Sequence, residues 1–188
     1  MKKDIILCGV GGQGILSIAT IIGEAATKAN VNLKQAEVHC MSQRGGDVQS
    51  NLRLSTEQIW SDLIPLGACD LIISMEPMEA LRYLPYLSKD GVIVTSNKPF
   101  INIPNYPEQE ALFAELGRLP HVVQLDIEQV AKDAGNARGA NVVLLGMAAK
   151  YIEIVTPEQL RTAIATIFAR KGEAIVEANL KAFDAANK

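Results

Sequence analysis

The sequence has little of what many binding and catalytic proteins depend on. Aromatic residues make up 5% of its 188 residues, and its formal net charge is −3. Nucleic-acid binding through broad electrostatics needs a basic surface, and single-strand binding needs stacking aromatics, so neither is expected. No apolar run approaches the roughly 18 residues of a membrane span, and glycines interrupt the apolar start, as in a strand rather than a signal peptide. We therefore expect a cytoplasmic protein that binds no nucleic acid and no membrane.

Cysteines are also few, and they are scattered without a C-x-x-C pair, at Cys8, Cys40 and Cys69. Three cysteines without metal spacing fit a reducing compartment better than a disulfide framework. Cys8 and Cys69 adjoin apolar runs, and we expect both to be buried small hydrophobes. An iron–sulfur cluster needs about four closely arranged thiolates, and two histidines without a carboxylate cluster make no metal site. We expect no metal or cluster on this chain alone.

A glycine cluster, Gly9-Val10-Gly11-Gly12-Gln13-Gly14, lies between an apolar run and a long apolar-rich segment. This order predicts a strand, a tight turn and a helix, so that backbone N–H groups and a helix N-terminus converge where an anion could bind. The spacing also matches the dinucleotide pattern G-x-G-x-x-G, which requires an acid at the end of the second strand to hold the ribose. Glu37 is at the right distance but lies inside its predicted strand. An NAD(P) or flavin module therefore stays an alternative.

Two further polar segments could take part in a site. Arg44, next to Gly45, could bind an anion or a partner's carboxylate in bidentate fashion, or could simply be exposed on a hairpin loop. Asn136, Arg138 and Asn141 precede a strongly apolar helix, where they could form a contact or cap the helix.

The remaining titratable residues favour structural roles. Glu76 and Glu79 flank Pro77 at a helix start, where negative charge is favourable, so we interpret them as capping residues rather than a catalytic pair. His39 could act as an acid or base but is more typical of a hydrogen-bonded strand residue, and His121 is expected at the surface. No Ser-His-Asp or Cys-His arrangement is present, so the sequence offers few candidate catalytic residues.

The pattern of apolar residues predicts an α/β fold. The expected strands are 5–8, 33–41, 47–54, 70–74, 91–95 and 122–125, and the expected helices are 15–29, 77–84, 108–116, 127–135, 142–152 and two beyond 156 that are separated near 171–172. The second and third strands are too close for a crossover helix, so we expect an antiparallel hairpin. The prediction is a three-layer, Rossmann-like, mostly parallel sheet with a hairpin after strand two. Residues 1–188 would form one domain, with C-terminal helices as an extension at about 156–188.

Four segments together resemble the gamma-type subunit of 2-oxoacid:ferredoxin oxidoreductases. They are Gly9–Gly14, Glu37–Gly46, Asp70–Arg82 and Gly135–Asn141, and the similarity in order and length covers nearly the whole chain. The form of the second segment is most similar to the indolepyruvate branch of that family. One departure is Cys40, where the family usually has glycine, so contacts around His39 are the least secure to transfer.

The resemblance implies a reaction in which a 2-oxoacid, an arylpyruvate such as indolepyruvate, and coenzyme A give an acyl-CoA, CO2 and reduced ferredoxin. It places thiamine diphosphate and the iron–sulfur clusters in a larger partner subunit, which would also lead the electrons to ferredoxin. The small subunit would not be catalytic alone and would shape the coenzyme A side of the active site. The candidate contact residues are Gly9, Gly11, Gly12, Gln13, Gly14, Ser42, Gln43, Arg44, Gly45, Asn136 and Arg138.

Two other functions stay open at this point. One is a stand-alone NAD(P)- or flavin-binding Rossmann module that acts as a redox sensor or small reductase. The other is a non-catalytic scaffold that keeps the fold without the partner.

Overall fold

The computed structural model describes residues 1–39 and 46–187, without the side chain of His39. Six strands form one sheet: β1 (Lys2–Val10), β2 (Asn32–His39), β3 (Asp47–Ser55), β4 (Cys69–Ser74), β5 (Leu87–Ser96) and β6 (Val122–Leu125). Seven α-helices are described: α1 (Ile15–Lys28), α2 (Pro77–Arg82), α3 (Gln109–Gly117), α4 (Ile127–Asp133), α5 (Ala140–Ile152), α6 (Pro157–Phe168) and α7 (Glu173–Ala186). The predicted α/β class is confirmed.

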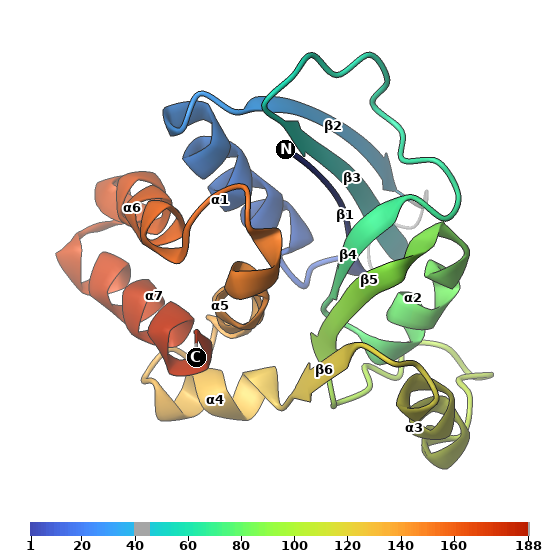
Figure 1. Ribbon diagram of the computed structural model, residues 1–188. Helices are drawn as coiled ribbons and strands as arrows, with labels where there is room; N and C mark the ends of the chain where they lie inside the picture. Colours follow the sequence, from blue (N-terminus) through green and yellow to red (C-terminus); the bar gives the residue numbers. More distant parts are fainter. Residues whose placement is uncertain (40–45, 188) are drawn as a thin grey trace.

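The sheet is mixed, with the strand order β2-β3-β1-β4-β5-β6 (Figure 1). Strands β1, β4, β5 and β6 pair in parallel, whereas β3 is antiparallel to both of its neighbours, β1 and β2. The expected hairpin of β2 and β3 is therefore present. What the sequence did not predict is that β3 lies between β1 and β2, so that the hairpin extends the sheet with β2 at its edge.

Helices cover both faces of the sheet, which gives the three predicted layers. Alternate residues of β1 point to opposite sides: Ile5 and Leu7 pack under α1 and α5, and Ile6 and Cys8 face the side of α2. The C-terminal helices α6 and α7 pack on α1 and α5 rather than apart from them, as Figure 1 shows in orange and red. Their burial makes them part of the same apolar core.

The helix boundaries follow capping residues that the sequence displays. Asp126 accepts a hydrogen bond from the Gln129 amide at 2.9 Å at the start of α4. Thr156 and Gln159 form a reciprocal capping box at the start of α6. These side chains satisfy amides that have no partner inside the helix, which is why the predicted starts are correct.

Some predicted boundaries were wrong. The helix expected over 77–84 ends at Arg82 and is followed by a short 3-10 helix, Leu84–Tyr86, because a proline at position 85 cannot continue an α-helix. Strand β5 starts four residues earlier than expected, because the exposed Lys89 and Asp90 interrupt the apolar pattern in its first half. The expected end of the second strand at Met41 lies outside the described residues. Within the described ranges, no helix is long and apolar enough to cross a membrane.

Candidate functional site

The carboxyl ends of β1 and β4 mark the place where a ligand is most readily bound in this fold. The chain leaves β1 for α1 on one face of the sheet and leaves β4 for α2 on the other. In open α/β sheets, ligands bind in the crevice at such a switch point, outside the carboxyl ends of the strands. The glycine loop after β1 and the residues after β4 meet here, joined by a hydrogen bond from the Met75 amide to the Cys8 carbonyl at 3.0 Å.

The glycine loop is a tight, internally bonded turn. Gly12 and Gly14 have φ angles of +98° and +84°, which glycine adopts without strain. The side chain of Gln13 folds back, and its Oε1 accepts a hydrogen bond from the Val10 amide at 2.7 Å. The Gly11 amide donates to the Gly46 carbonyl at 2.9 Å. Gln13 and Gly11 therefore hold the loop in shape, and the N-terminus of α1, capped by no side chain, lies at its end.

Two of the glycines are required by close packing. A Cβ atom on Gly9 would lie 2.8 Å from Gln13 Oε1 and 3.1 Å from Met75 Cβ. A Cβ atom on Gly14 would lie 2.7 Å from Nδ2 of Asn141, which donates to the Gly14 carbonyl at 3.2 Å. Among the described residues, no atom lies within 4 Å of the corresponding position on Gly12.

A groove of about 360 Å³ opens beside the start of α1. It is lined by Ser17, Asn136, Arg138, Asn141, Phe168, Lys171, Ile175, Ala178 and Asn179. These residues come from α1, from the turn between α4 and α5, from the start of α5 and from the C-terminal helices. Two of them are cationic and none is acidic, so the lining favours an anion.

The amides of the groove are held by one another. Asn136 Nδ2 donates to Asn179 Oδ1 at 3.3 Å, and Asn179 Nδ2 donates to the Ile175 carbonyl at 2.8 Å. Asn179 is almost fully buried, whereas Arg138 is exposed and Lys171 lies over the ring of Phe168. The groove thus has a fixed amide floor and two cations at its rim.

The structure brings some of the predicted site residues together and leaves others undescribed. Gly14 is joined through Asn141 to the groove that holds Asn136 and Arg138. Ser42, Gln43, Arg44 and Gly45, with Cys40, lie outside the described residues. The flanking strand ends, His39 and Asp47, lie at the same edge of the sheet as the glycine loop, because Asp47 pairs with Val10.

Glu76 has the predicted capping role and a second role that the sequence did not indicate. One carboxylate oxygen accepts from the Glu79 amide at 3.0 Å at the start of α2. The other accepts from the Phe100 amide at 3.3 Å and from the hydroxyl of Tyr106. Glu76 is fully buried, and burial raises its pKa above the ordinary value of 4.5. It ties the segment after β5 to the end of β4. Glu79 instead pairs with Arg82 at 2.7 Å.

Both described cysteines are buried, as predicted. Burial raises the pKa of the Cys69 thiol to about 12 and raises that of Cys8 further, so both stay protonated at neutral pH. A buried, protonated thiol is neither a nucleophile nor a metal ligand. Across residues 1–39 and 46–187, no group of three His, Cys, Asp or Glu side chains could hold a metal ion.

The strand order weighs against the dinucleotide interpretation. In a Rossmann dinucleotide site the second strand lies next to the first, so that its acid can reach the ribose. Here β3 separates β2 from β1, which moves Glu37 two strand spacings, or about 10 Å, from β1.

Two residues of the groove were not predicted from the sequence. Lys171 and Asn179 lie 30 and 38 residues beyond the end of the polar patch at 136–141 and reach it only because α7 packs against α4 and α5. A buried asparagine in an amphipathic helix, as at position 179, is the one feature of the sequence that could have indicated such a contact.

Comparison with known proteins now adds to this geometry. The family model described as pyruvate ferredoxin/flavodoxin oxidoreductase matches residues 4–188. Indolepyruvate oxidoreductase subunit IorB of Archaeoglobus fulgidus is 35% identical over 97% of this chain and 92% of the relative. The subunit of the same name from Pyrococcus horikoshii is 36% identical over 98% of this chain and 94% of the length of that subunit.

A longer relative and a solved structure support the same family. Ketoisovalerate oxidoreductase subunit VorA of Methanothermobacter thermautotrophicus is 26% identical over 95% of this chain, but the match covers only 34% of that subunit. The crystal structure of the keto/oxoacid ferredoxin oxidoreductase gamma subunit from Geobacter sulfurreducens superposes with a TM-score of 0.70 at 26% identity, covering 98% of this chain and 96% of that one. The chain therefore belongs to the pyruvate ferredoxin/flavodoxin oxidoreductase family, as a small, gamma-type subunit of a 2-oxoacid:ferredoxin oxidoreductase.

Proposed function

We propose that this chain, together with a larger subunit, oxidises an arylpyruvate such as indolepyruvate, and that its glycine-loop edge binds coenzyme A. The bond between C1 and C2 of the 2-oxoacid breaks and CO2 leaves. The acyl carbon joins the sulfur of coenzyme A, whose thiol proton is released, and two electrons pass to ferredoxin. The choice of substrate rests on the similarity of 35–36% to IorB subunits over almost the full length of both chains.

We assign thiamine diphosphate and the iron–sulfur clusters to the larger subunit, because the described residues of this chain are not suited to bind them. Cys8 and Cys69 are buried thiols rather than thiolates, and no described cluster suits the divalent cation that accompanies a diphosphate. Thiamine diphosphate supplies the carbon–carbon cleavage, and the clusters supply the electron path. This chain contributes the binding of the acyl acceptor.

The groove next to α1 is where we place the phosphates of coenzyme A. Arg138 and Lys171 supply two positive charges at its rim, and the N-terminus of α1 adds the partial positive charge of the helix dipole. The lining contains no acid that would repel a phosphate. In the neighbouring glycine loop, no described atom lies within 4 Å of the Cβ position of Gly12, and the missing side chain lets a ligand approach the backbone closely.

Removal of the two cations tests this site. In the assembled enzyme, Arg138→Ala and Lys171→Ala should each raise the KM for coenzyme A by about tenfold or more, since a charge-assisted hydrogen bond contributes about 1.5–3 kcal/mol. The KM for the 2-oxoacid should not change. The matched controls are Arg118→Ala on α3 and Lys181→Ala on α7, whose side chains are exposed and paired on their own helices. An unchanged KM for coenzyme A in both groove variants would place its phosphates elsewhere.

Substrate choice is tested on the same complex. Coenzyme A-dependent reduction of ferredoxin should be fastest, measured as kcat/KM, with indolepyruvate. Pyruvate, 2-oxoglutarate and 2-ketoisovalerate serve as competing substrates. A preference for any of these three would overturn the arylpyruvate assignment while leaving the coenzyme A site untouched.

A further inference from the structure

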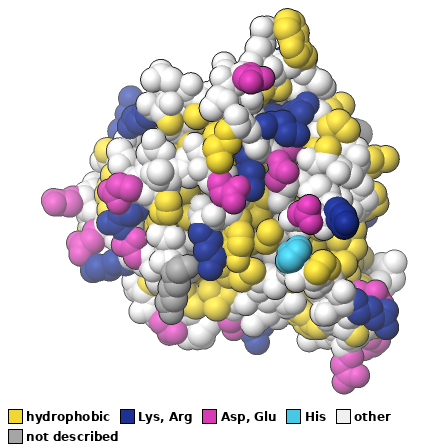
Figure 2. All heavy atoms as spheres, viewed as in Figure 1, with side chains coloured by type: hydrophobic (Ala, Val, Ile, Leu, Met, Phe, Trp, Pro, Cys, Tyr) yellow, Lys and Arg dark blue, Asp and Glu magenta, His cyan; other side chains and the backbone are white. Residues whose placement is uncertain are grey.

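The segment 56–68, between β3 and β4, displays large apolar side chains to solvent. The exposed fractions of Trp60, Leu66 and Leu63 are 83%, 70% and 59%. In Figure 1 this segment, in green-blue, forms the outer rim of the molecule beside β3, and Figure 2 shows hydrophobic side chains at the surface along that rim. Trp60 is the one tryptophan of the whole chain. Three large apolar side chains exposed within seven residues of one ordered segment are more than the single exposed residues of an ordinary surface, and they indicate an interaction site.

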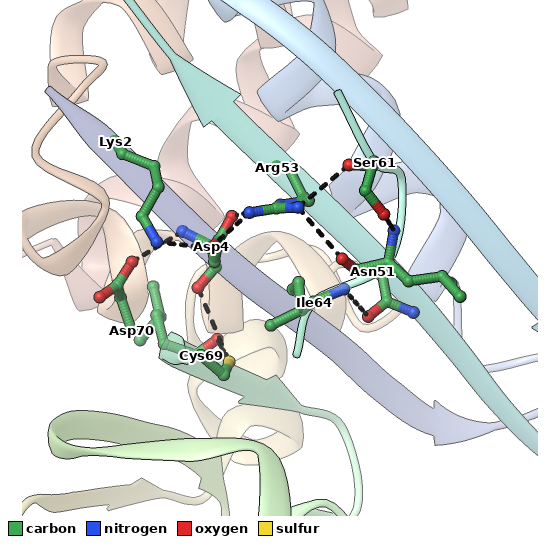
Figure 3. Close-up of polar contacts among 10 residues, drawn as sticks. Lys2, Asp4, Asn51, Arg53, Ser61, Ile64, Cys69 and Asp70 are labelled. Carbon is green, nitrogen blue, oxygen red and sulfur yellow. Dashed lines mark hydrogen bonds and ion pairs between the residues drawn. The ribbon is translucent and has the colours of Figure 1, made fainter. Parts of the chain in front are cut away.

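The backbone of this segment is held in place by buried polar groups beneath it (Figure 3). Arg53 Nη1 donates to the carbonyl oxygens of Ser61 and Leu63, each at 3.1 Å. The rest of its guanidinium donates to the fully buried carboxylate of Asp4, at 2.8 and 3.2 Å. One arginine thereby fixes the carbonyls on either side of Asp62.

A second anchor lies one residue further along. The Ile64 amide donates to Oδ1 of the buried Asn51 at 3.4 Å, and the Ile64 side chain packs in the core on the α2 side of the sheet. The Lys34 ammonium also pairs with Asp62 at 3.0 Å. The segment is therefore fixed while Trp60, Leu63 and Leu66 project from it. A preorganised loop with an aromatic anchor loses little conformational entropy on binding, which is typical of a protein-docking element.

The sheet face next to this segment continues the exposed surface. Helix α2 packs on β1, β4 and β5, whereas α1 covers the opposite face of β2 and β3. On the face that Arg53 and Asn51 share, the register of the hairpin places Val38 beside Gln49, and Val38 is 54% exposed. The outer face of the hairpin thus leads from segment 56–68 toward the edge of the sheet where the glycine loop lies.

The lengths of the relatives indicate what covers this surface. This chain corresponds to only 34% of the ketoisovalerate subunit VorA, so in that protein a comparable unit is joined to about twice its own length of further polypeptide. In the assembly proposed above, the larger subunit supplies the corresponding polypeptide. The acyl carbon on that subunit must reach coenzyme A at the glycine-loop edge, whereas segment 56–68 follows Ser55 at the opposite end of β3. A partner lying along the whole outer face of the hairpin, past Val38, would contact both places.

We propose that Trp60, Leu63, Leu66 and Val38 form the surface on which the larger, cofactor-carrying subunit docks, an inference that rests on the proposed function above. Trp60 is the anchor, and the Asp4–Arg53 pair holds its loop ready. A second copy of this chain is the competing occupant, and it is an outcome of the test.

The tryptophan provides a specific probe. The full chain is labelled with 5-fluorotryptophan, which gives one fluorine resonance, and the unlabelled larger subunit of the same organism is added anaerobically while complex formation is followed by light scattering. The expected result is a complex in which the resonance shifts and broadens. A complex with an unchanged resonance overturns the docking surface and leaves the proposed function standing. Absence of any complex overturns both. A shift that depends on the concentration of this chain alone assigns the surface to a second copy.

Variants give an independent measure. Trp60→Ser should weaken the binding of the larger subunit by about tenfold or more, with Leu66→Ser acting in the same direction. The control is Lys181→Ser, since Lys181 is exposed on α7, which lies on the opposite face of the sheet from segment 56–68. Trp60 and Leu66 are exposed, so the unfolding temperature of their variants should stay within a few degrees of the parent. Equal affinity of the parent and all variants for the larger subunit would contradict the proposal.

Discussion

Asn141, at the start of α5, donates a hydrogen bond from Nδ2 to the carbonyl oxygen of Gly14, 127 residues away, at 3.2 Å. The contact joins the glycine loop to the groove in which we place the phosphates of coenzyme A. It also explains the glycine, because Gly14 combines a φ of +84° with an approach that leaves no room for a Cβ atom.

Substitution of Gly14 should therefore be costly for two separable reasons. Gly14→Ala should lower the free energy of unfolding by about 1–3 kcal/mol for the left-handed backbone, and by a further 1–3 kcal/mol, roughly, for the overlap with Asn141. Gly135→Ala is the matched control, because Gly135 has a φ of +80° and no described atom lies within 4 Å of the position that its Cβ would take. Denaturant unfolding measures both variants.

A double variant separates the cost of the left-handed backbone from the cost of the overlap with Asn141. Adding Asn141→Ala to Gly14→Ala removes the overlap, so the combined loss should be smaller than the sum of the single losses. Strict additivity, or an equal loss in Gly14→Ala and Gly135→Ala, would contradict the contact.

Glu76 should give stability a specific pH dependence. Burial raises its pKa in the folded chain above 4.5, so between 4.5 and the raised value the folded chain retains a proton that the unfolded chain has released. Stability contributed by this group is present below pH 4.5 and is lost as pH rises through that window, at up to about 1.4 kcal/mol per pH unit.

The slope is measured by denaturant unfolding at a series of pH values. Glu76→Gln should flatten it, because the amide does not titrate. Glu128→Gln, at an exposed acid in the first turn of α4, is the control and should keep the parent slope. A Glu76→Gln variant with the parent slope would show that the carboxyl does not titrate as described.

Arg53 should control the order of segment 56–68. Arg53→Lys keeps the charge but cannot hold Asp4 and two carbonyls at once, so we expect a loss of about 1–3 kcal/mol in the free energy of unfolding. Chymotrypsin should then cleave faster after Trp60 and Leu63. Arg118→Lys, on the exposed end of α3, should change neither quantity. Cleavage at the parent rate would mean that other contacts hold the loop.

The two buried thiols should be unreactive in the folded chain. In a Cys40→Ser variant, the thiol reagent DTNB at pH 8 should modify Cys8 and Cys69 only after denaturant is added, because both are buried and protonated. Rapid modification of either thiol without denaturant would be inconsistent with this burial.

Local signals in the sequence predicted most of the elements and some of the boundaries. The limits of β6 and the starts of α4 and α6 follow from apolar runs and from the caps at Asp126 and Thr156, which act within a few residues. The hairpin of β2 and β3 follows from a connection too short for a helix. The place of β3 between β1 and β2 could not be predicted, because either strand of an antiparallel hairpin can pair with β1.

The site was harder to predict than the fold because distant segments build it. Asn136 and Arg138 were visible as a polar patch, but Lys171 and Asn179 join them only through the packing of α7. Glu76 carries the pattern of an ordinary cap, and its burial depends on Tyr106 and Phe100, in a segment without regular structure. The contact predicted for Arg44 stays a prediction, since that residue lies outside the described ranges.

The most direct test of the account is one assay of the anaerobically purified complex of this chain with its larger subunit. Reduction of ferredoxin by indolepyruvate is measured with and without coenzyme A, and with the Arg138→Ala/Lys171→Ala variant. The account predicts rapid reduction that requires coenzyme A, with a KM for coenzyme A raised about tenfold or more in the variant. Turnover by this chain alone, or by the complex without coenzyme A, would contradict it.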